Sequence, residues 1–134
     1  VIIGQNCDIG PNCFIRPSTA VGDNCHIGNA VEVKNSIIMR GSKIPHHNYV
    51  GDSIIGEGCN LGAGAKIANL RLDKKGIWVA NTDTGRRKLG AIIGDNVEIG
   101  INTSINIGSM IGNDTHIGPG TTVSGIISPN SRIF

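Results

Sequence analysis

Between Lys43 and Asn69 the sequence gathers polar residues of the kinds that catalyse reactions or bind charged ligands. The segment reads KIPHHNYVGDSIIGEGCNLGAGAKIAN, and His46 stands in it three residues before Tyr49. A histidine titrates near neutral pH and can take a proton from a reacting group. An isolated histidine more often occupies a polar turn, so the role of His46 depends on its surroundings.

Two cations near the N-terminus share a regular spacing, because Arg16 and Lys34 are 18 residues apart. In a chain that coils with this period, the two side chains stack about 4.8 Å apart on one face. Such cations repel each other unless an anion lies between them. Arginine offers a fork of donors and lysine a point charge, which together suit a phosphate. A solvated surface pair is the alternative.

The elements that must position these residues follow a six-residue period. Neither a strand period of two nor a helical period of 3.6 explains a step of six. A glycine often follows the aliphatic residue of each step. Outside irregular stretches, the aliphatic positions are Ile3, Ile9, Ile15, Val21, Ile27, Val33, Leu61, Ile67, Ile93, Ile99, Ile105, Ile111, Ile117 and Val123.

Short strands joined by turns explain this step, with the aliphatic residue pointing inward and Gly or Asn in the turn. Three hexapeptides close a triangular coil of about 18 residues, and stacked coils pair as parallel strands. We therefore predict an all-β fold, a left-handed parallel β-helix of hexapeptide repeats. The left hand is an exception to the usual crossover rule, so its prediction rests on the hexapeptide signature.

The fourth residue after each aliphatic one also faces inward, at a corner with room only for a small side chain. All four cysteines, Cys7, Cys13, Cys25 and Cys59, fall on this position. They are therefore predicted to be small buried side chains and not metal ligands. A disulfide between Cys7 and Cys25, one coil apart, stays open. Reduced cysteines fit a cytoplasmic protein.

The repeat breaks at about residues 70–91. A solenoid tolerates an insertion at a corner, because each coil contacts only its neighbours. The cations of this insertion are Lys74, Lys75, Arg86, Arg87 and Lys88. In the whole chain, 12 Lys+Arg against 10 Asp+Glu leave a net charge of +2. This charge is too weak to argue for nucleic acid or a membrane surface as partner, and no stretch approaches the roughly 20 apolar residues of a membrane span.

The ordered polar residues resemble those of the acetyltransferase domain of bacterial N-acetylglucosamine-1-phosphate uridylyltransferase/glucosamine-1-phosphate acetyltransferase. They resemble still more those of the archaeal sugar-1-phosphate nucleotidylyltransferase/acetyltransferases. Many acyltransferases share hexapeptides, whereas this ordered set is specific. The matching elements are IRP at 15–17, VEVK at 31–34, HHNYVGDS at 46–53, IGEGCNLGAGA at 55–65, Asn69, the insertion lysines and IIGDNVEIG at 92–100.

The resemblance implies a catalytic base. It identifies His46 as the residue that removes a proton from the amine of an amino-sugar 1-phosphate, so that the amine attacks acetyl-CoA. Glu32 matches an acidic residue that assists this histidine, and a nearby carboxylate raises the basicity of an imidazole. Direct attack needs no Ser or Cys nucleophile.

The resemblance also implies binding positions for both substrates. Those for the sugar phosphate are Arg16, Lys34, Tyr49, Asn60, Asn69 and Lys75. Lys74 or Lys88 could take the role of Lys75. Those for acetyl-CoA are Ala63, Asn69, Arg86 and Arg87. For the two arginines, a solvated loop or a subunit contact is an equal alternative to the coenzyme phosphates. The chain has Ile101 and Pro119 where the family has a serine and an alanine, so contacts through the serine hydroxyl are lost.

Beyond the site, the resemblance implies a homotrimer with active sites between adjacent subunits, located in the cytoplasm. It further implies an N-terminal nucleotidylyltransferase domain in the complete protein, which agrees with the missing initial Met. Magnesium would serve that domain alone. Glucosamine-1-phosphate is the expected acceptor, and galactosamine-1-phosphate stays open.

Two other functions were considered. One is a non-catalytic oligomerisation or regulatory domain of a sugar nucleotidylyltransferase, which has no reason to carry His46, Tyr49 and Asn69 together. The other is a zinc-dependent carbonic anhydrase of the left-handed β-helix class, with His26 and His116 among its ligands. These histidines lie 90 residues apart, so they should not meet within a subunit, and no metal site is predicted.

Overall fold

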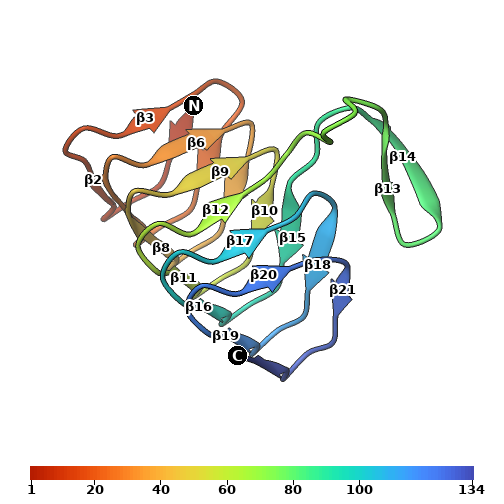
Figure 1. Ribbon diagram of the computed structural model, residues 1–134. Helices are drawn as coiled ribbons and strands as arrows, with labels where there is room; N and C mark the ends of the chain where they lie inside the picture. Colours follow the sequence, from red (N-terminus) through yellow and green to blue (C-terminus); the bar gives the residue numbers. More distant parts are fainter.

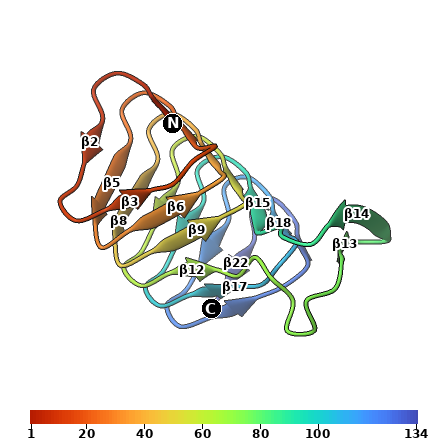
Figure 2. The same cartoon turned by 90° about the horizontal axis from the view of Figure 1, so that it is seen from above.

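The computed structural model describes all 134 residues, and every regular element in it is a β-strand. Three sheets of parallel strands form the sides of a triangular prism, which the chain visits in turn (Figure 1). The coils stack from the N-terminus at one end of the prism to the C-terminus at the other (Figure 2). The architecture is the predicted left-handed parallel β-helix. No helical segment of the chain could cross a membrane.

Three faces make up the prism. The first face contains β1 (Ile2–Ile3), β4 (Ala20–Val21), β7 (Ile37–Ile38), β10 (Ile54–Ile55), β15 (Ala91–Ile93), β18 (Ser109–Ile111) and β21 (Ile126–Ile127). The second face contains β2 (Asp8–Ile9), β5 (His26–Asn29), β8 (Lys43–His46), β11 (Asn60–Leu61), β16 (Glu98–Ile99), β19 (His116–Ile117) and β22 (Arg132–Ile133). The third face contains β3 (Phe14–Ile15), β6 (Glu32–Lys34), β9 (Tyr49–Gly51), β12 (Lys66–Ile67), β17 (Ser104–Ile105) and β20 (Thr122–Val123).

Corners join the faces. The first corner leads from the first face to the second, the second corner from the second face to the third, and the third corner from the third face back to the first. Asx side chains cap the first corner, where Oδ1 of Asp95 accepts a hydrogen bond from the backbone N–H of Glu57 at 2.8 Å. Each corner therefore stacks on the corresponding corner of the next coil.

The core is a ladder of aliphatic side chains closed by small residues at the corners. Val33 pairs with Val50 on the next strand, and both are fully buried. Cys25 and Cys59 occupy buried corner positions, as predicted, and burial raises the pKa of both thiols. All four cysteines are free, so Cys7 and Cys25 are not bonded to each other.

Two shortened coils explain the irregular stretch of the sequence. The register pairs Val21 with Ile38 and Ile38 with Ile55, each 17 residues further along instead of the expected 18. The chain is one residue shorter at the third corner, where Asn35 and Asp52 turn it with φ angles of 46° and 52°. The predicted coil length is therefore wrong by one residue in the region where polar residues gather.

The insertion leaves the prism at the third corner, close to the predicted boundaries. It departs after Asn69 and returns at Gly90, whose backbone N–H donates to the carbonyl oxygen of Asp52 at 2.8 Å. Its centre is an antiparallel hairpin of β13 (Ile77–Val79) and β14 (Thr82–Arg86), which projects away from the prism (Figure 1). The third corner is thus the one corner that carries a large addition.

Candidate active site

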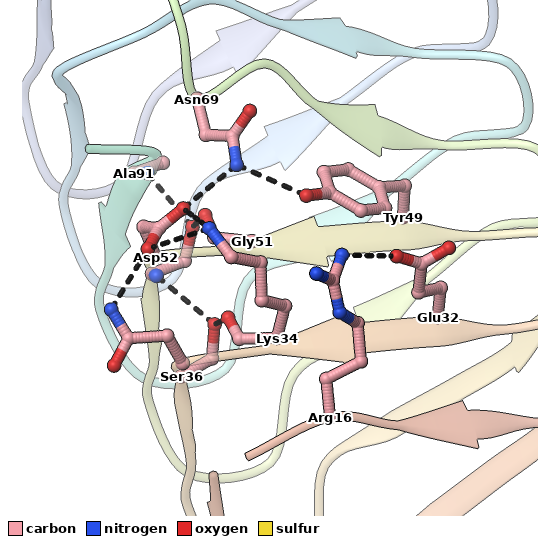
Figure 3. A network of polar contacts seen from close by, with 11 residues as sticks. Arg16, Glu32, Lys34, Ser36, Tyr49, Gly51, Asp52, Asn69 and Ala91 are labelled. Atoms are coloured by element: carbon pink, nitrogen blue, oxygen red, sulfur yellow. Dashed lines mark hydrogen bonds and ion pairs between the residues drawn. The ribbon is translucent and has the colours of Figure 1, made fainter. Parts of the chain in front are cut away.

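Asp52 is a buried carboxylate at the third corner, and it was not among the residues predicted from the sequence. Its side chain is 5% exposed. Nζ of Lys34 lies 3.0 Å from Oδ2 and 3.3 Å from Oδ1. Nδ2 of Asn35 lies 2.8 Å from Oδ1, and Nδ2 of Asn69 lies 2.7 Å from Oδ2 (Figure 3). One carboxylate therefore ties together three successive coils.

The contacts of Asp52 keep it ionised. Burial alone would raise the pKa of this carboxyl group. The hydrogen bonds from Asn35, Lys34 and Asn69, together with the charge of Lys34, outweigh burial and hold the pKa below its usual value. A sequence signal did exist, because Asn35, Asp52 and Asn69 follow one another at intervals of 17 residues. That interval is meaningful only once the shortened coils are known.

Tyr49 and Asn69 meet across the backbone of Gly51. Nδ2 of Asn69 donates to the Tyr49 hydroxyl at 3.0 Å. A Cβ atom on Gly51 would lie 2.6 Å from both of these polar atoms. Glycine is thus required here because any side chain would separate Tyr49 from Asn69.

Arg16 and Lys34 lie on successive strands of the third face, as their spacing predicted. The backbone N–H of Arg16 donates to the carbonyl oxygen of Val33 at 2.8 Å, which sets the two coils in register. Each cation already has a carboxylate partner: Nη1 of Arg16 lies 3.0 Å from Oε2 of Glu32, and Lys34 is paired with Asp52. A phosphate at this face would therefore share the two cations with two carboxylates.

His46 lies at the second corner, at the end of β8, with its side chain exposed. Its backbone N–H donates to Oδ1 of Asn48 at 3.0 Å. Asn48 is 3% exposed, and its Nδ2 donates to the carbonyl oxygens of Gly62 at 2.9 Å and Ala65 at 3.0 Å. This buried amide, which was not predicted, ties the His46 corner to the next coil, where Ala63 occupies the same corner.

The structure does not link the two predicted catalytic residues. Glu32 belongs to β6 on the third face, and its carboxylate is bonded to Arg16. No hydrogen bond or ion pair joins Glu32 to His46. Within one chain, Glu32 is therefore grouped with the predicted phosphate ligands.

Asn60 lies on a different face from the other predicted sugar-phosphate ligands. It belongs to β11 on the second face, between Lys43 and Glu98 of the neighbouring strands. A surface groove of about 440 Å³ lies beside it. Its lining includes Asn60, Gly62, Gly100, Ile101, Pro119 and Phe134. Both positions at which the chain departs from the family's donor site, Ile101 and Pro119, therefore border this groove.

The insertion separates its cations. The backbone N–H of Lys75 donates to Oδ1 of Asp73 at 3.0 Å, and the Lys75 side chain is exposed. Nε of Arg87 donates to the carbonyl oxygen of Lys74 at 3.2 Å. Arg86 borders a hollow of about 280 Å³ at the third corner, which Asp52 also lines. Of the insertion cations, Arg86 alone therefore lies against the corner that holds Asp52.

The two histidines considered as zinc ligands are far apart, as predicted. Both point outward from the second face, in one row whose members from strand to strand are His26, Lys43, Asn60, Glu98 and His116. Four strand steps separate the two imidazoles, which corresponds to about 19 Å.

The outward positions of the first face form an apolar stripe, which the sequence reasoning missed. From strand to strand its members are Ile2, Ala20, Ile37, Ile54, Ile92, Met110 and Ile126. Ile37 is 45% exposed and Ile126 61%. A contiguous exposed apolar surface of this kind marks a site of protein–protein contact.

Sequence comparison identifies the family. A family model described as the GMPPB C-terminal domain matches residues 1–99, which is more than half of the chain. The chain belongs to the GMPPB C-terminal domain family. A second model, the hexapeptide repeat of succinyl-transferase, matches residues 90–125 of this family member.

Curated relatives of this GMPPB C-terminal domain are bifunctional enzymes. A protein of Sulfurisphaera tokodaii named bifunctional sugar-1-phosphate nucleotidylyltransferase/acetyltransferase is 53% identical over 91 residues, covering 65% of the chain and 23% of the relative. The bifunctional protein GlmU of Methanocaldococcus jannaschii is 45% identical over 101 residues, covering 72% of the chain and 24% of the relative. The chain thus spans about a quarter of the length of the curated relatives that it matches.

Solved structures share the fold of this GMPPB C-terminal domain. The acetyltransferase domain of PglB from Neisseria gonorrhoeae superposes with a TM-score of 0.76 at 16% identity, over 94% of the chain and 53% of PglB. PerB from Caulobacter crescentus, solved with CoA and GDP-perosamine, gives a TM-score of 0.75 at 21% identity, over 96% of the chain and 52% of PerB. At these identities the likeness concerns the fold.

Proposed function

We propose that this protein transfers the acetyl group of acetyl-CoA to the amine of an amino-sugar 1-phosphate. The observation that carries the proposal is the cluster of Arg16, Lys34, Tyr49 and Asn69 on the third face and its corner. This cluster lies in a chain that is 53% identical over 91 residues to a bifunctional sugar-1-phosphate nucleotidylyltransferase/acetyltransferase. A purely structural coil needs none of these four residues.

The phosphate of the acceptor binds over Arg16 and Lys34. The two cations follow each other on neighbouring strands, and both have side chains that are only partly exposed, 39% for Arg16 and 20% for Lys34. A dianion binds such a pair through charge-assisted hydrogen bonds. Lys75 at the neck of the insertion adds a third cation when the insertion closes over the phosphate.

His46 acts as the base. An amino-sugar nitrogen is largely protonated near neutral pH and then has no lone pair for attack. The imidazole takes one proton, the nitrogen forms a bond to the thioester carbonyl carbon, and the C–S bond breaks to release CoA as a thiol after protonation. The exposed side chain of His46 is free to meet the substrate, because the corner is held by Asn48 through backbone atoms.

Glu32 assists His46 once the phosphate is bound. In the structure its carboxylate is occupied by Arg16. A dianionic phosphate competes for the same guanidinium group and frees the carboxylate. The freed carboxylate then favours the protonated imidazole that forms during the reaction.

Acetyl-CoA binds along the second corner. Ala63 lies there one coil beyond His46, and the groove of about 440 Å³ beside Asn60 continues towards Ile101 and Pro119. Small residues let a pantetheine arm approach the backbone closely. Arg86 and Arg87 contact the coenzyme phosphates, and Asn69 contacts both substrates. A structure of the PglB domain holds acetyl coenzyme A on the same fold.

The active unit is a homotrimer with sites between adjacent subunits. His46, Asn60 and Ala63 lie on or beside the second face, whereas Tyr49 and Asn69 lie on the third face and the third corner. A second subunit is needed to bring these two groups together around one substrate. The apolar stripe on the first face supplies a surface for such assembly.

The complete protein carries a nucleotidylyltransferase domain before this region, as its curated relatives are bifunctional. The acetylated sugar phosphate would be the substrate of that second activity, which magnesium assists. Free thiols at all four cysteines support a cytoplasmic location.

A coupled assay for free CoA thiol tests the proposal. We expect thiol release with glucosamine-1-phosphate, a comparison rate with galactosamine-1-phosphate, and a fall in kcat of at least a hundredfold for His46→Ala. His47→Asn serves as the matched control, because asparagine tolerates the φ of 52° at that residue. Absence of thiol release from the wild type would favour a non-catalytic β-helix domain, and unchanged release from His46→Ala would remove His46 as base.

A further inference from the structure

Asn69 uses both hydrogens of its amide group within the protein. Nδ2 donates to Oδ2 of Asp52 at 2.7 Å and to the Tyr49 hydroxyl at 3.0 Å. No protein group donates to Oδ1 of Asn69. Figure 3 shows this oxygen turned away from both Asp52 and Tyr49. The amide therefore shows one open acceptor to a ligand.

The orientation of this amide is dictated by charge. An ionised carboxylate only accepts hydrogen bonds, so Asn69 must turn Nδ2 and not Oδ1 towards Asp52. The Tyr49 hydroxyl accepts from the same Nδ2, which leaves its own hydrogen free to be donated elsewhere. The sequence of contacts from Asp52 through Asn69 to Tyr49 thus has a defined direction.

The three equivalent corner residues of successive coils are Asn35, Asp52 and Asn69, and only the middle one is charged. With an amide in the middle as well, each neighbouring amide could turn either way. A single group that only accepts, placed between two amides, fixes both of them. The same carboxylate holds Nζ of Lys34 at 3.0 Å.

We propose that Asp52 is a positioning residue that sets the hydrogen-bond polarity of the acceptor site. Through Asn69 it presents one acceptor, Oδ1 of Asn69, and one donor, the Tyr49 hydroxyl. The acceptor suits an N–H or O–H of an amino sugar, and the donor suits one of its oxygens. This inference rests on the proposed function, since it names the ligand groups that the same site selects.

Steady-state kinetics of Asp52→Asn, which preserves the shape of the side chain, test the proposal. We expect the KM for glucosamine-1-phosphate to rise tenfold or more, while the KM for acetyl-CoA changes less than twofold. Asp95→Asn is the matched control, because Asp95 accepts a backbone N–H at the first corner, away from the site. An unchanged acceptor KM in Asp52→Asn, or equal changes in both KM values, would overturn the assignment.

A second measurement separates this inference from the proposed function. Side-chain amide NMR of the ¹⁵N-labelled protein reports on Asn69 without substrate, and Asn69→Leu identifies its signals. We expect slow hydrogen exchange of both Asn69 amide hydrogens in the wild type and fast exchange in Asp52→Asn, with the signals of Asn48 unchanged. This result without thiol release would defeat the proposed function and leave the Asp52–Asn69 orientation standing. Equal exchange in both proteins would overturn the orientation itself.

Discussion

Nη1 of Arg16 lies 3.0 Å from Oε2 of Glu32, on the neighbouring strand of the third face. The two side chains are 39% and 38% exposed. An ion pair that is this accessible to water contributes less than about 1 kcal/mol. A dianionic phosphate can therefore displace Glu32 from Arg16, which couples binding of the phosphate to release of the carboxylate.

Arg16→Ala should raise the KM for the sugar phosphate tenfold or more, because it removes a charge-assisted hydrogen bond of about 1.5 to 3 kcal/mol. Arg16→Lys should fall between the wild type and Arg16→Ala, since the fork of donors is lost but the charge stays. Arg40→Ala is the control, because Arg40 forms a similar pair with Glu57 at 3.3 Å, remote from the site. A change confined to the acetyl-CoA KM would contradict the assignment of Arg16.

Gly51→Ala should weaken the acceptor site while the fold persists. The added Cβ would stand 2.6 Å from Nδ2 of Asn69 and from the Tyr49 hydroxyl, so the bond between them must break. We expect the acceptor KM to rise severalfold and circular dichroism to keep its β signature. Gly76→Ala provides a comparison in the insertion, where the added Cβ would meet only a backbone oxygen at 3.9 Å. Equal kinetics for the two variants would show that the contact between Tyr49 and Asn69 is dispensable.

Acid should remove the stabilisation that Asp52 provides. Its pKa in the folded protein lies below the ordinary value of 3.8. The stabilisation is therefore complete above the unfolded-state pKa and is lost as the pH falls through the lower, folded-state pKa. In urea unfolding, the wild type should exceed Asp52→Asn in stability at pH 7, and this difference should shrink below about pH 4. A difference that stays constant with pH would show that the charge of Asp52 is irrelevant to stability.

Ile54→Lys should dissociate the proposed trimer. Ile54 lies in the middle of the apolar stripe, between Ile37 and Ile92 on the neighbouring strands. A lysine buried in an interface must lose its hydration or disrupt the contact. Light scattering should show a threefold lower mass for this variant than for the wild type. Thr122→Lys on the third face should keep the wild-type mass, and a trimer that survives Ile54→Lys would assign assembly to another surface.

Much of the fold could be predicted because side-chain direction in a β-helix is a local property. The step of six from Ile3 to Val33 and from Ile93 to Val123 placed aliphatic residues inward, and the structure buries most of them. The corner position predicted for Cys25 and Cys59 is buried for the same reason. The apolar stripe on the first face was missed because the inward period drew attention away from the residue before it.

The candidate site was predictable in part. The spacing of 18 between Arg16 and Lys34 correctly placed them on one face, since that coil has the regular length. Asp52 and Asn48 gave no sign of their importance, because an Asp at a turn and a polar residue in an irregular stretch are both ordinary. Their roles depend on partners 14 to 17 residues away, on other coils.

The sequence by itself determined the prism, its inward residues and the corner that carries the insertion, because a repeated hexapeptide fixes each of these within a few residues. Only the tertiary structure decided which polar side chains meet. One residue fewer at the third corner shifts every later coil, so Asp52 falls between Asn35 and Asn69 and takes Lys34 as its partner. Hydrogen bonds depend on distances of about 3 Å, and a shift of one residue in register, about 3.3 Å, makes or breaks them.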